Sequence, residues 1–350
     1  MRDAAIIGYV QGPQRRYAGA ANESELVMPV VRDVMAQVGV TQKDIDFTCS
    51  GSCDYLQGAA FAFVEGLSAL ATVPPIKESH VEMDAAWALY EALLKVWIGE
   101  ADLCLVYGFG KSSPGELRTV MSLQLDPYYH VPLWPDSISL AALQARAMLD
   151  SGVIGERDMA EVVARSRSNA QSNPNAQLKG NPGIEQLLAE PTFVSPLRRH
   201  DCPPITDGAS AMIIASADVA ARYCKRPAWV RGIDHRMETG IIGARDLTRS
   251  PSTRIAGEKA GVARGKVDLA ELHAPFSHQE LILRRELGLE DSVPVNLSGG
   301  ALAGNTMMAA GLDRIGYVAA QIMGGKADRG VAHATSGPCL QQNLVAVLEA

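Results

Sequence analysis

Residues 99–108 read GEADLCLVYG and residues 325–334 read GKADRGVAHA, so Gly-x-Ala-Asp leads into a strand-like run twice, at an offset of 226. A second pair of segments agrees with the first. Residues 39–46 read GVTQKDID and residues 261–268 read GVARGKVD, at an offset of 222. Either match alone could be chance, but two independent matches at nearly the same offset indicate an internal repeat. The sequence therefore predicts two copies of one unit, roughly residues 1–115 and 215–350.

Each copy is expected to alternate strands with helices. The apolar runs at 4–8, 45–48 and 103–107 are typical of buried strands, whereas residues 25–38 and 85–98 have helical spacing. This alternation predicts a layered α/β fold with a mainly parallel sheet.

A different kind of sequence separates the two copies. Residues 111–200 include KSSPGE, DPYYHVPLWPD and SNPNAQLKGNPG, which are typical of surface turns, and a polar helical stretch near 156–172. The segment PPITDGASAMIIAS at 203–216 then restores a turn followed by an apolar strand. We therefore expect an insertion between the two units.

Composition excludes several classes of protein. The chain has 350 residues, 47% of them hydrophobic and 5% aromatic, and its net charge of -7 argues against nucleic-acid binding. No run of about 18 apolar residues and no signal-like start is present, so we expect a cytoplasmic protein without a membrane segment.

The sequence shows no pattern typical of a metal or cofactor site. Cys49 and Cys53 lack a second ligand pair, which argues against a metal site. The GFGKSSPG segment at 108–115 lacks the helix start and acidic residue of a dinucleotide site, so no cofactor is expected.

Six short segments, in the same order and at similar spacings, resemble the thiolase superfamily. The resemblance is greatest to the sterol carrier protein thiolase branch and its bacterial lipid-transfer relatives, including steroid side-chain aldolases. The segments are AAIIGYV at 4–10, GEADLCLVYGFGK at 99–111, TDGASA at 206–211, HAPF at 273–276, NLSGGALAGN at 296–305 and LQQN at 340–343. The resemblance covers essentially the whole chain. It implies a five-layer α/β thiolase fold with two pseudo-symmetric βαβ-rich halves, 1–115 and 201–350. A loop domain, 116–200, would lie over acyl-CoA.

The first site comparison concerns the nucleophile. A Claisen thiolase needs a Cys at a helix N-terminus, where the helix dipole lowers the thiol pKa. In this chain the corresponding place falls in HVEMDAAW, near Glu82, Met83 and Asp84, and it contains no Cys. A covalent acyl-enzyme is therefore not expected. Glu82 and Asp84 are candidate catalytic carboxylates, and the alternative is that they only cap the helix.

The second comparison concerns the oxyanion site. The family motif His-Asp-Cys-Phe is represented by HAPF, in which His273 and Phe276 remain and Pro275 replaces the Cys. His273 follows a predicted strand, at the edge of a parallel sheet where ligands gather, so we favour a functional role over that of a buried core histidine. Asn305 stands where the family has the activating His; its amide cannot act as a base near pH 7, but its NH2 group can donate to a thioester oxygen.

The remaining candidates are expected to contact substrate. Ser298, Gly299 and Gly300 belong to the glycine-rich motif, where close backbone approach is expected. Cys339 lies near the place of the second thiolase Cys, beside Gly337, and is either a proton-transfer group or a structural thiol. Tyr128 and Tyr129 are candidates for a base or for acyl contacts, although an aromatic cluster in a lid more often serves packing.

Two functions are compatible with these residues. The resemblance implies a carbon–carbon lyase that performs retro-aldol cleavage of a β-hydroxyacyl-CoA, a reaction that needs a base and an oxyanion site but no nucleophile. The alternative is a catalytically degenerate subunit that binds acyl-CoA or supports a partner enzyme. The resemblance also implies a homodimer or thiolase-like heterodimer and a small OB-fold partner that binds acyl-CoA.

Overall fold

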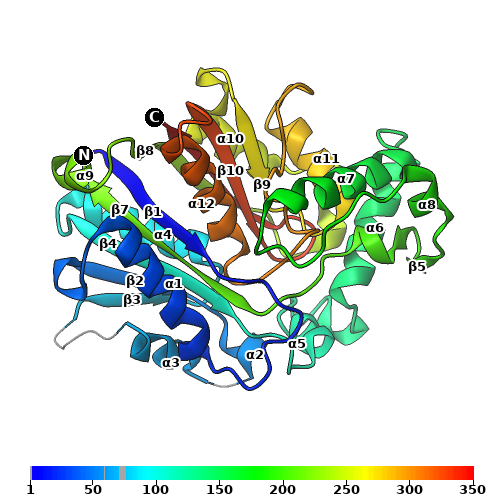
Figure 1. Cartoon of the computed structure of the whole chain (residues 1–350). Coiled ribbons are helices and arrows are strands. Elements are labelled where there is room, and N and C mark those ends of the chain that lie inside the picture. Colours follow the sequence, from blue (N-terminus) through cyan, green and yellow to red (C-terminus); the bar gives the residue numbers. More distant parts are fainter. Residues whose placement is uncertain (1, 59, 71–75) are drawn as a thin grey trace.

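The computed structural model describes residues 2–58, 60–70 and 76–350. Nine strands form one mixed sheet in the order β3-β2-β4-β7-β1-β8-β11-β10-β9 (Figure 1). They are β1 (Ala4–Gln11), β2 (Phe47–Gly51), β3 (Glu78–Val81), β4 (Leu103–Gly110), β7 (Gly208–Ser216), β8 (Ala228–Met237), β9 (Leu269–Leu272), β10 (Arg329–Ser336) and β11 (Gln342–Glu349). A separate short pair comprises β5 (Thr192–Val194) and β6 (Leu197–Arg198).

The strand order confirms the internal repeat. In the first half β2 and β4 pair in parallel, followed by antiparallel β7 and β1. In the second half β9 and β10 pair in parallel, followed by antiparallel β11 and β8. The two halves meet where β1 pairs with β8 through only two residue pairs.

The repeated motifs perform the same local task in both halves. The carboxylate of Asp46 accepts from two backbone N–H groups at the start of β4, at 2.9 and 3.0 Å. The carboxylate of Asp268 accepts from the two equivalent groups at the start of β10, both at 3.0 Å. The glycines that open the four segments all have positive φ at or just after a helix end, a conformation that favours glycine; they are Gly39, Gly99, Gly261 and Gly325.

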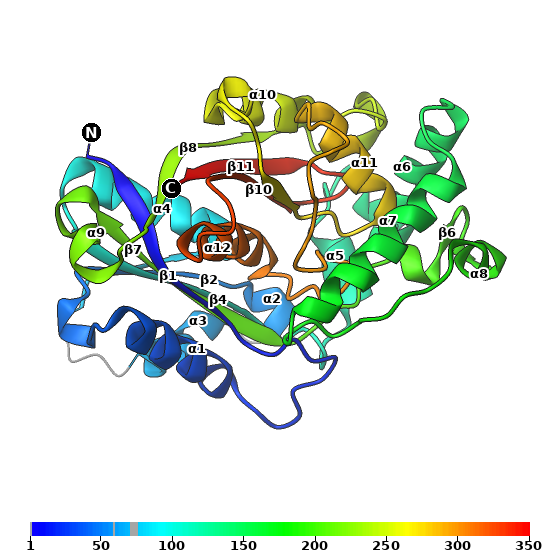
Figure 2. The same cartoon turned by 45° about the horizontal axis from the view of Figure 1, so that its top comes forward.

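Helices lie on both outer faces of the folded sheet and between its halves, which gives five layers (Figure 2). The inner layer consists of α4 (Ala85–Ile98) and α12 (Ala310–Met323), and their side chains join inward-facing residues of both halves in one buried cluster. The outer layers contain α1 (Glu23–Val38) on the first half, and α10 (Pro251–Ala260) with α11 (Ser277–Glu286) on the second. The inner position accounts for the many apolar residues of α4, of which residues 85–89, Ala92, Leu93 and Val96 are buried, whereas Glu91 and Lys95 lie on its outer side.

The expectation of a mainly parallel sheet is wrong. Among the described strands of the large sheet, β2 pairs in parallel with β3 and β4, and β9 with β10, whereas the other five pairings are antiparallel. Only a short turn separates β10 from β11, and so short a connection permits only antiparallel pairing.

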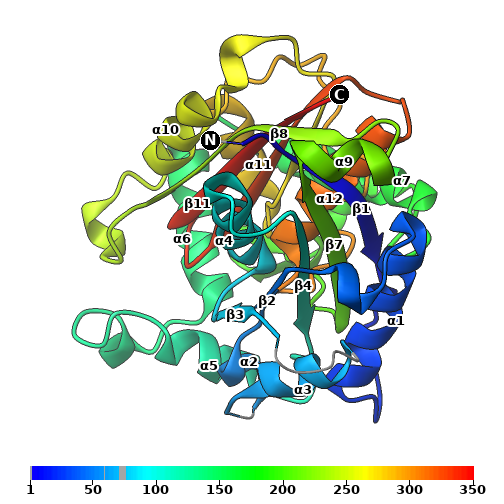
Figure 3. The same ribbon diagram turned by 90° about the vertical axis from the view of Figure 1, so that its left-hand side faces the viewer.

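The chain between β4 and β7 forms helices at one end of the molecule (Figure 1). They are α5 (Leu117–Leu123), α6 (Ser137–Asp150), α7 (Glu156–Asn169) and α8 (Ile184–Ala189). The other helices are α2 (Asp54–Gln57), α3 (Ala62–Ser68) and α9 (Ala217–Tyr223). Seen from the side, the α5 segment and the loop between β8 and α10 project from the same face (Figure 3). Within the described residues, no helix has the length and apolar character needed to cross a membrane.

Candidate active site

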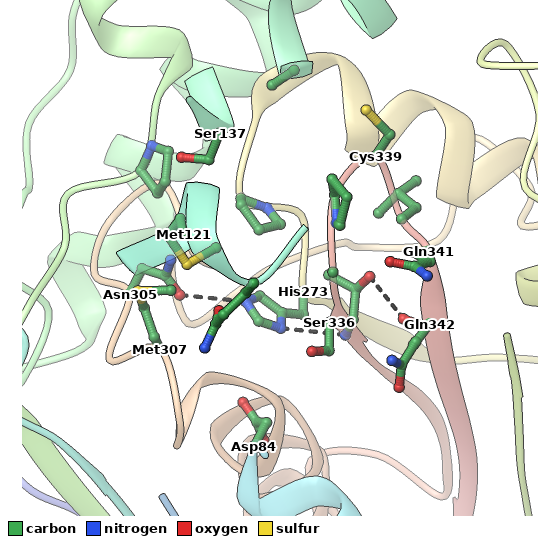
Figure 4. A pocket seen from close by; sticks show the side chains of 18 of the residues that line it. Asp84, Met121, Ser137, His273, Asn305, Met307, Ser336, Cys339, Gln341 and Gln342 are labelled. Atoms are coloured by element: carbon green, nitrogen blue, oxygen red, sulfur yellow. Dashed lines mark hydrogen bonds between the residues drawn. The ribbon is translucent and has the colours of Figure 1, made fainter. Parts of the chain in front are cut away.

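A cavity of about 430 Å³ lies at the carboxyl ends of the parallel strands. Its wall combines residues that follow β3, β9 and β10 with residues of α5, α6 and the loop before α12. The predicted site residues that line it are Glu82, Asp84, His273, Phe276, Asn305, Gly337 and Cys339. Figure 4 shows His273 and Asn305 side by side, with Asp84 across the open space. Residues from distant parts of the sequence thus converge at one place.

His273 is a neutral hydrogen-bond donor at this site. The backbone N–H of Thr335 donates to His273 Nδ1 at 3.4 Å, which places the ring proton on Nε2. Nε2 lies 3.3 Å from Asn305 Oδ1 and donates to it. Burial, together with the nearby Arg314 guanidinium and His333, lowers the pKa of His273 to about 3. The imidazole is therefore uncharged at neutral pH, and its N–H faces the amide side chain of Asn305.

Asp84 lies where the N-termini of the two inner helices converge. Its carboxylate accepts from the backbone N–H of Ala86 in α4 at 2.8 Å. It also accepts from Gly311 and Leu312 at the start of α12, at 2.7 and 3.2 Å. The side chain is 1% exposed, and this burial raises the pKa of Asp84 to about 7 despite the three donors. Asp84 is thus a cap for both inner helices and a carboxyl group whose pKa burial holds well above the ordinary value.

Glu82 lies nearer the rim. Its side chain is half-exposed, interacts with His80 at 3.2 Å and accepts from the backbone N–H of Asp54 at 2.6 Å. It thereby connects the end of β3 to the start of α2.

Cys339 and Cys53 also line the cavity. Cys339 is buried, its Sγ donates to the carbonyl of Leu140 at 3.4 Å, and burial raises its pKa to about 11. Burial likewise raises the pKa of Cys53, whose Sγ accepts from the Gln124 amide at 3.5 Å. Neither thiol has the lowered pKa of a catalytic nucleophile. No sequence pattern predicts that Cys53 reaches the cavity, because α2 has no distinctive motif.

Ser298, Gly299 and Gly300, which were expected to contact substrate, are not among the residues that line this cavity. Ser298 Oγ donates to the buried carboxylate of Glu271 at 2.6 Å and accepts from the Arg314 guanidinium at 2.9 Å. The two glycines have positive φ, and a side chain at Gly299 would clash with neighbouring alanines. The glycine-rich motif therefore allows close packing of the loop before α12. The spacing of its residues in the sequence does not distinguish this packing role from contact with a ligand.

Tyr128 and Tyr129 are not brought to the cavity either. The two residues are 83% and 63% exposed, and the Asp126 carboxylate accepts from both of their backbone N–H groups. The sequence also missed much of the apolar wall, which includes Met121 and Met307. No local pattern could identify them, since isolated methionines are common in cores.

We expect no acylated cysteine when the protein turns over an acyl-CoA. The N-terminus of α4 presents Asp84 instead of a thiol, and burial keeps Cys53 and Cys339 protonated at neutral pH. Intact-protein mass spectrometry after exposure to acetyl-CoA and acetoacetyl-CoA should show only the unmodified mass. Rapid stoichiometric acylation of one Cys would contradict this expectation.

Among the described residues, no group of three or more His, Cys, Asp or Glu side chains is arranged to hold a metal ion. The side chains that line the cavity offer amides, carboxylates, hydroxyls, two thiols and one neutral imidazole, together with apolar groups. Such a set can bind an uncharged oxygen, stabilise a developing negative charge and exchange one proton.

Comparison with known proteins finds relatives that match most of this chain. No family model matches the chain. It is 28% identical to an acetyl-CoA acetyltransferase of Methanothermobacter thermautotrophicus, over 96% of this chain and 95% of that protein. It is also 28% identical to 17-hydroxy-3-oxo-4-pregnene-20-carboxyl-CoA lyase of Mycobacterium tuberculosis, over 81% of this chain and 78% of the lyase.

Solved structures agree on the fold. Human mitochondrial 3-ketoacyl-CoA thiolase superposes with a TM-score of 0.80 at 17% identity, covering 100% of this chain and 99% of the thiolase chain. A chain of the Ltp2-ChsH2(DUF35) aldolase superposes with a TM-score of 0.80 at 18% identity, covering 99% and 98%. The five-layer arrangement is the one these proteins share.

Proposed function

We propose that this chain, which belongs to the thiolase superfamily, cleaves a carbon–carbon bond of a β-hydroxyacyl-CoA without forming an acyl-enzyme. One observation carries the proposal. The cavity retains the His273 and Asn305 side chains, which contact each other through His273 Nε2 and Asn305 Oδ1, while the N-terminus of α4 presents the carboxylate of Asp84 where a thiolase needs a thiol. Enolate stabilisation is common to thiolysis and retro-aldol cleavage, whereas a nucleophile serves only the first.

The reaction needs two kinds of group. A base removes the proton of the β-hydroxyl, the bond between the α and β carbons breaks, and a ketone or aldehyde leaves. The electron pair of that bond moves into the thioester enolate, whose oxygen replaces Asn305 Oδ1 as the acceptor for His273 Nε2–H and also accepts from the Asn305 NH2 group. Protonation of the α carbon then gives a shorter acyl-CoA. Asp84, with its pKa raised to about 7, is the proposed base and can return the proton.

The apolar wall favours a lipid-like acyl group. Leucine and methionine side chains from α5, α6 and the loop before α12, together with Ile205 before β7, line the cavity. A steroid or other lipid side chain would bury its hydrocarbon against them, with release of propionyl-CoA or acetyl-CoA. The lyase from Mycobacterium tuberculosis, which the chain resembles along most of its length, supports this choice.

We also propose that the chain assembles as a homodimer or thiolase-like heterodimer and acts with a small OB-fold protein that binds acyl-CoA. The structural likeness to the Ltp2-ChsH2(DUF35) aldolase, itself a two-component enzyme by name, supports a second subunit.

A binding subunit without activity is the second candidate. The observation that favours it is the carboxylate of Asp84, which is buried and already accepts three backbone hydrogen bonds. Such a group can be wholly structural.

Product analysis separates the two functions. We expect that the purified chain, co-purified with its partner, converts a tertiary β-hydroxyacyl-CoA into equal amounts of a ketone and a shorter acyl-CoA, measured by liquid chromatography and mass spectrometry. The same mixture should not use free CoA to cleave a β-ketoacyl-CoA. Intact substrate with chain and partner together would favour the binding subunit, and thiolysis would contradict the loss of the nucleophile.

A further inference from the structure

The turn between β10 and β11 forms one wall of the cavity in an unusual backbone conformation. Gly337, Cys339 and Leu340 have φ of 74°, 54° and 59°, all in the left-handed region. That region is costly for residues with a Cβ atom, and only glycine enters it freely. Two adjacent non-glycine residues in this conformation persist only where surrounding groups hold them.

Arg245 supplies much of that restraint from the loop between β8 and α10. Its Nη1 donates to the carbonyl of Pro338 at 3.1 Å, and its Nη2 donates to Cys339 and Leu340 at 2.6 and 3.3 Å. The Arg245 side chain is 3% exposed, with the Glu238 carboxylate 3.8 Å from its Nε. One buried guanidinium therefore binds three successive carbonyls of the turn, a task suited to its planar set of donors.

The turn has a second contact and a direct connection to the candidate oxyanion site. The Gln144 amide in α6 donates to the Cys339 carbonyl at 3.4 Å. At the end of β10, just before the turn, the backbone N–H of Thr335 donates to His273 Nδ1, and Thr335 Oγ1 donates to the carbonyl of Gln342. A shift of the turn would therefore move both the cavity wall and the group that fixes the His273 tautomer.

We propose that Arg245 is a positioning residue, which holds the 337–340 turn so that the wall and His273 keep their geometry. Arg245 does not line the cavity, so it acts through the turn and not by touching a ligand. The expected effect of Arg245 on catalysis rests on the proposed function, whereas its expected effect on the stability of the 337–340 turn does not.

The test compares Arg245→Met, Arg245→Lys and the control Arg254→Met, whose side chain is half-exposed on α10 and pairs with Glu258. The first measurement is the rate at which iodoacetamide labels Cys339, followed by peptide mass spectrometry at a pH and temperature where all variants are folded. Cys339 is only 4% exposed, so labelling in the wild type reports rare opening of the turn. We expect labelling at least ~10-fold faster in Arg245→Met, an intermediate rate in Arg245→Lys, and the wild-type rate in the control.

The second measurement is kinetic. Because a misplacement of ~1 Å can cost about a hundredfold, kcat/KM for the β-hydroxyacyl-CoA should fall by roughly that factor in Arg245→Met and less in Arg245→Lys. If Cys339 is labelled in Arg245→Met at the same rate as in the wild type, the proposal is overturned. Faster labelling of Cys339 with an unchanged kcat/KM would also overturn it. If Arg245→Met does not fold, the labelling rate and kcat/KM are measured for Arg245→Lys and judged in the same way. If the wild type lacks lyase activity, the proposed function fails, and the labelling rates together with the affinity for a stable thioether analogue of the substrate decide the role of Arg245.

Discussion

Replacing His273 by Ala is expected to lower kcat for carbon–carbon cleavage by about a hundredfold or more, the usual cost of removing one oxyanion donor. His273 is neutral, its Nδ1 accepts from the Thr335 N–H, and its Nε2–H points toward the Asn305 amide in the cavity. The enolate oxygen carries more charge than the substrate carbonyl, so a donor to it stabilises the transition state more than the bound substrate. KM should therefore change much less than kcat.

The control is His235→Ala, since His235 lies on β8 at an exposed position away from the cavity. It should keep the wild-type rate. Thermal unfolding should be compared for both variants, because His273 is buried and its removal leaves a gap. An unchanged kcat in folded His273→Ala would contradict the oxyanion role and favour the binding-subunit function.

Replacing Asp84 by Asn is expected to lower kcat by about two to four orders of magnitude, the range typical of a lost general base. Asn keeps one oxygen for the N–H groups of Ala86 and Leu312 but turns an NH2 group towards the Gly311 N–H, so the free energy of unfolding should also fall, by roughly 1–2 kcal/mol. Rates are therefore compared at a temperature where the variant is fully folded. Glu91→Gln, on the same helix outside the cavity, is the matched control.

The pH profile distinguishes a lost base from a lost helix cap. Burial raises the pKa of Asp84 to about 7, so the carboxyl group is protonated below this pH and becomes a base above it. We expect kcat/KM of the wild type to rise tenfold per pH unit below about 7 and to level off above it. Residual activity of Asp84→Asn should lack this rise. If the rise persists in Asp84→Asn and disappears in Glu82→Gln, the base is Glu82.

Much of the fold was predictable because its signals are local. The paired segments at 39–46 and 99–108, with their counterparts at 261–268 and 325–334, predicted the internal repeat, and the structure shows that they contain glycines at helix ends and Asp side chains that bind the starts of two strands. Apolar runs and helical spacing located β1, β4, α1 and α4 to within a few residues. His273 was predicted at a strand end because the strand and the residue after it are neighbours in sequence. The missing thiol near residue 84 was equally evident, since an absent residue type needs no coordinates.

Tertiary structure alone decided what those residues contact. Asp84 accepts from Gly311, 227 positions away, and Arg245 binds carbonyls more than 90 positions away. The glycine-rich motif showed close packing, but only the fold placed Ser298 beside Glu271 and away from the cavity. Periodicity encodes which face of an element is buried, and it does not encode which distant element covers that face. The sequence therefore determined the elements and the loss of the nucleophile. Only tertiary packing buried Asp84 between the starts of α4 and α12, which raises its pKa, and brought Asn305 in the loop before α12 to His273 at the end of β9.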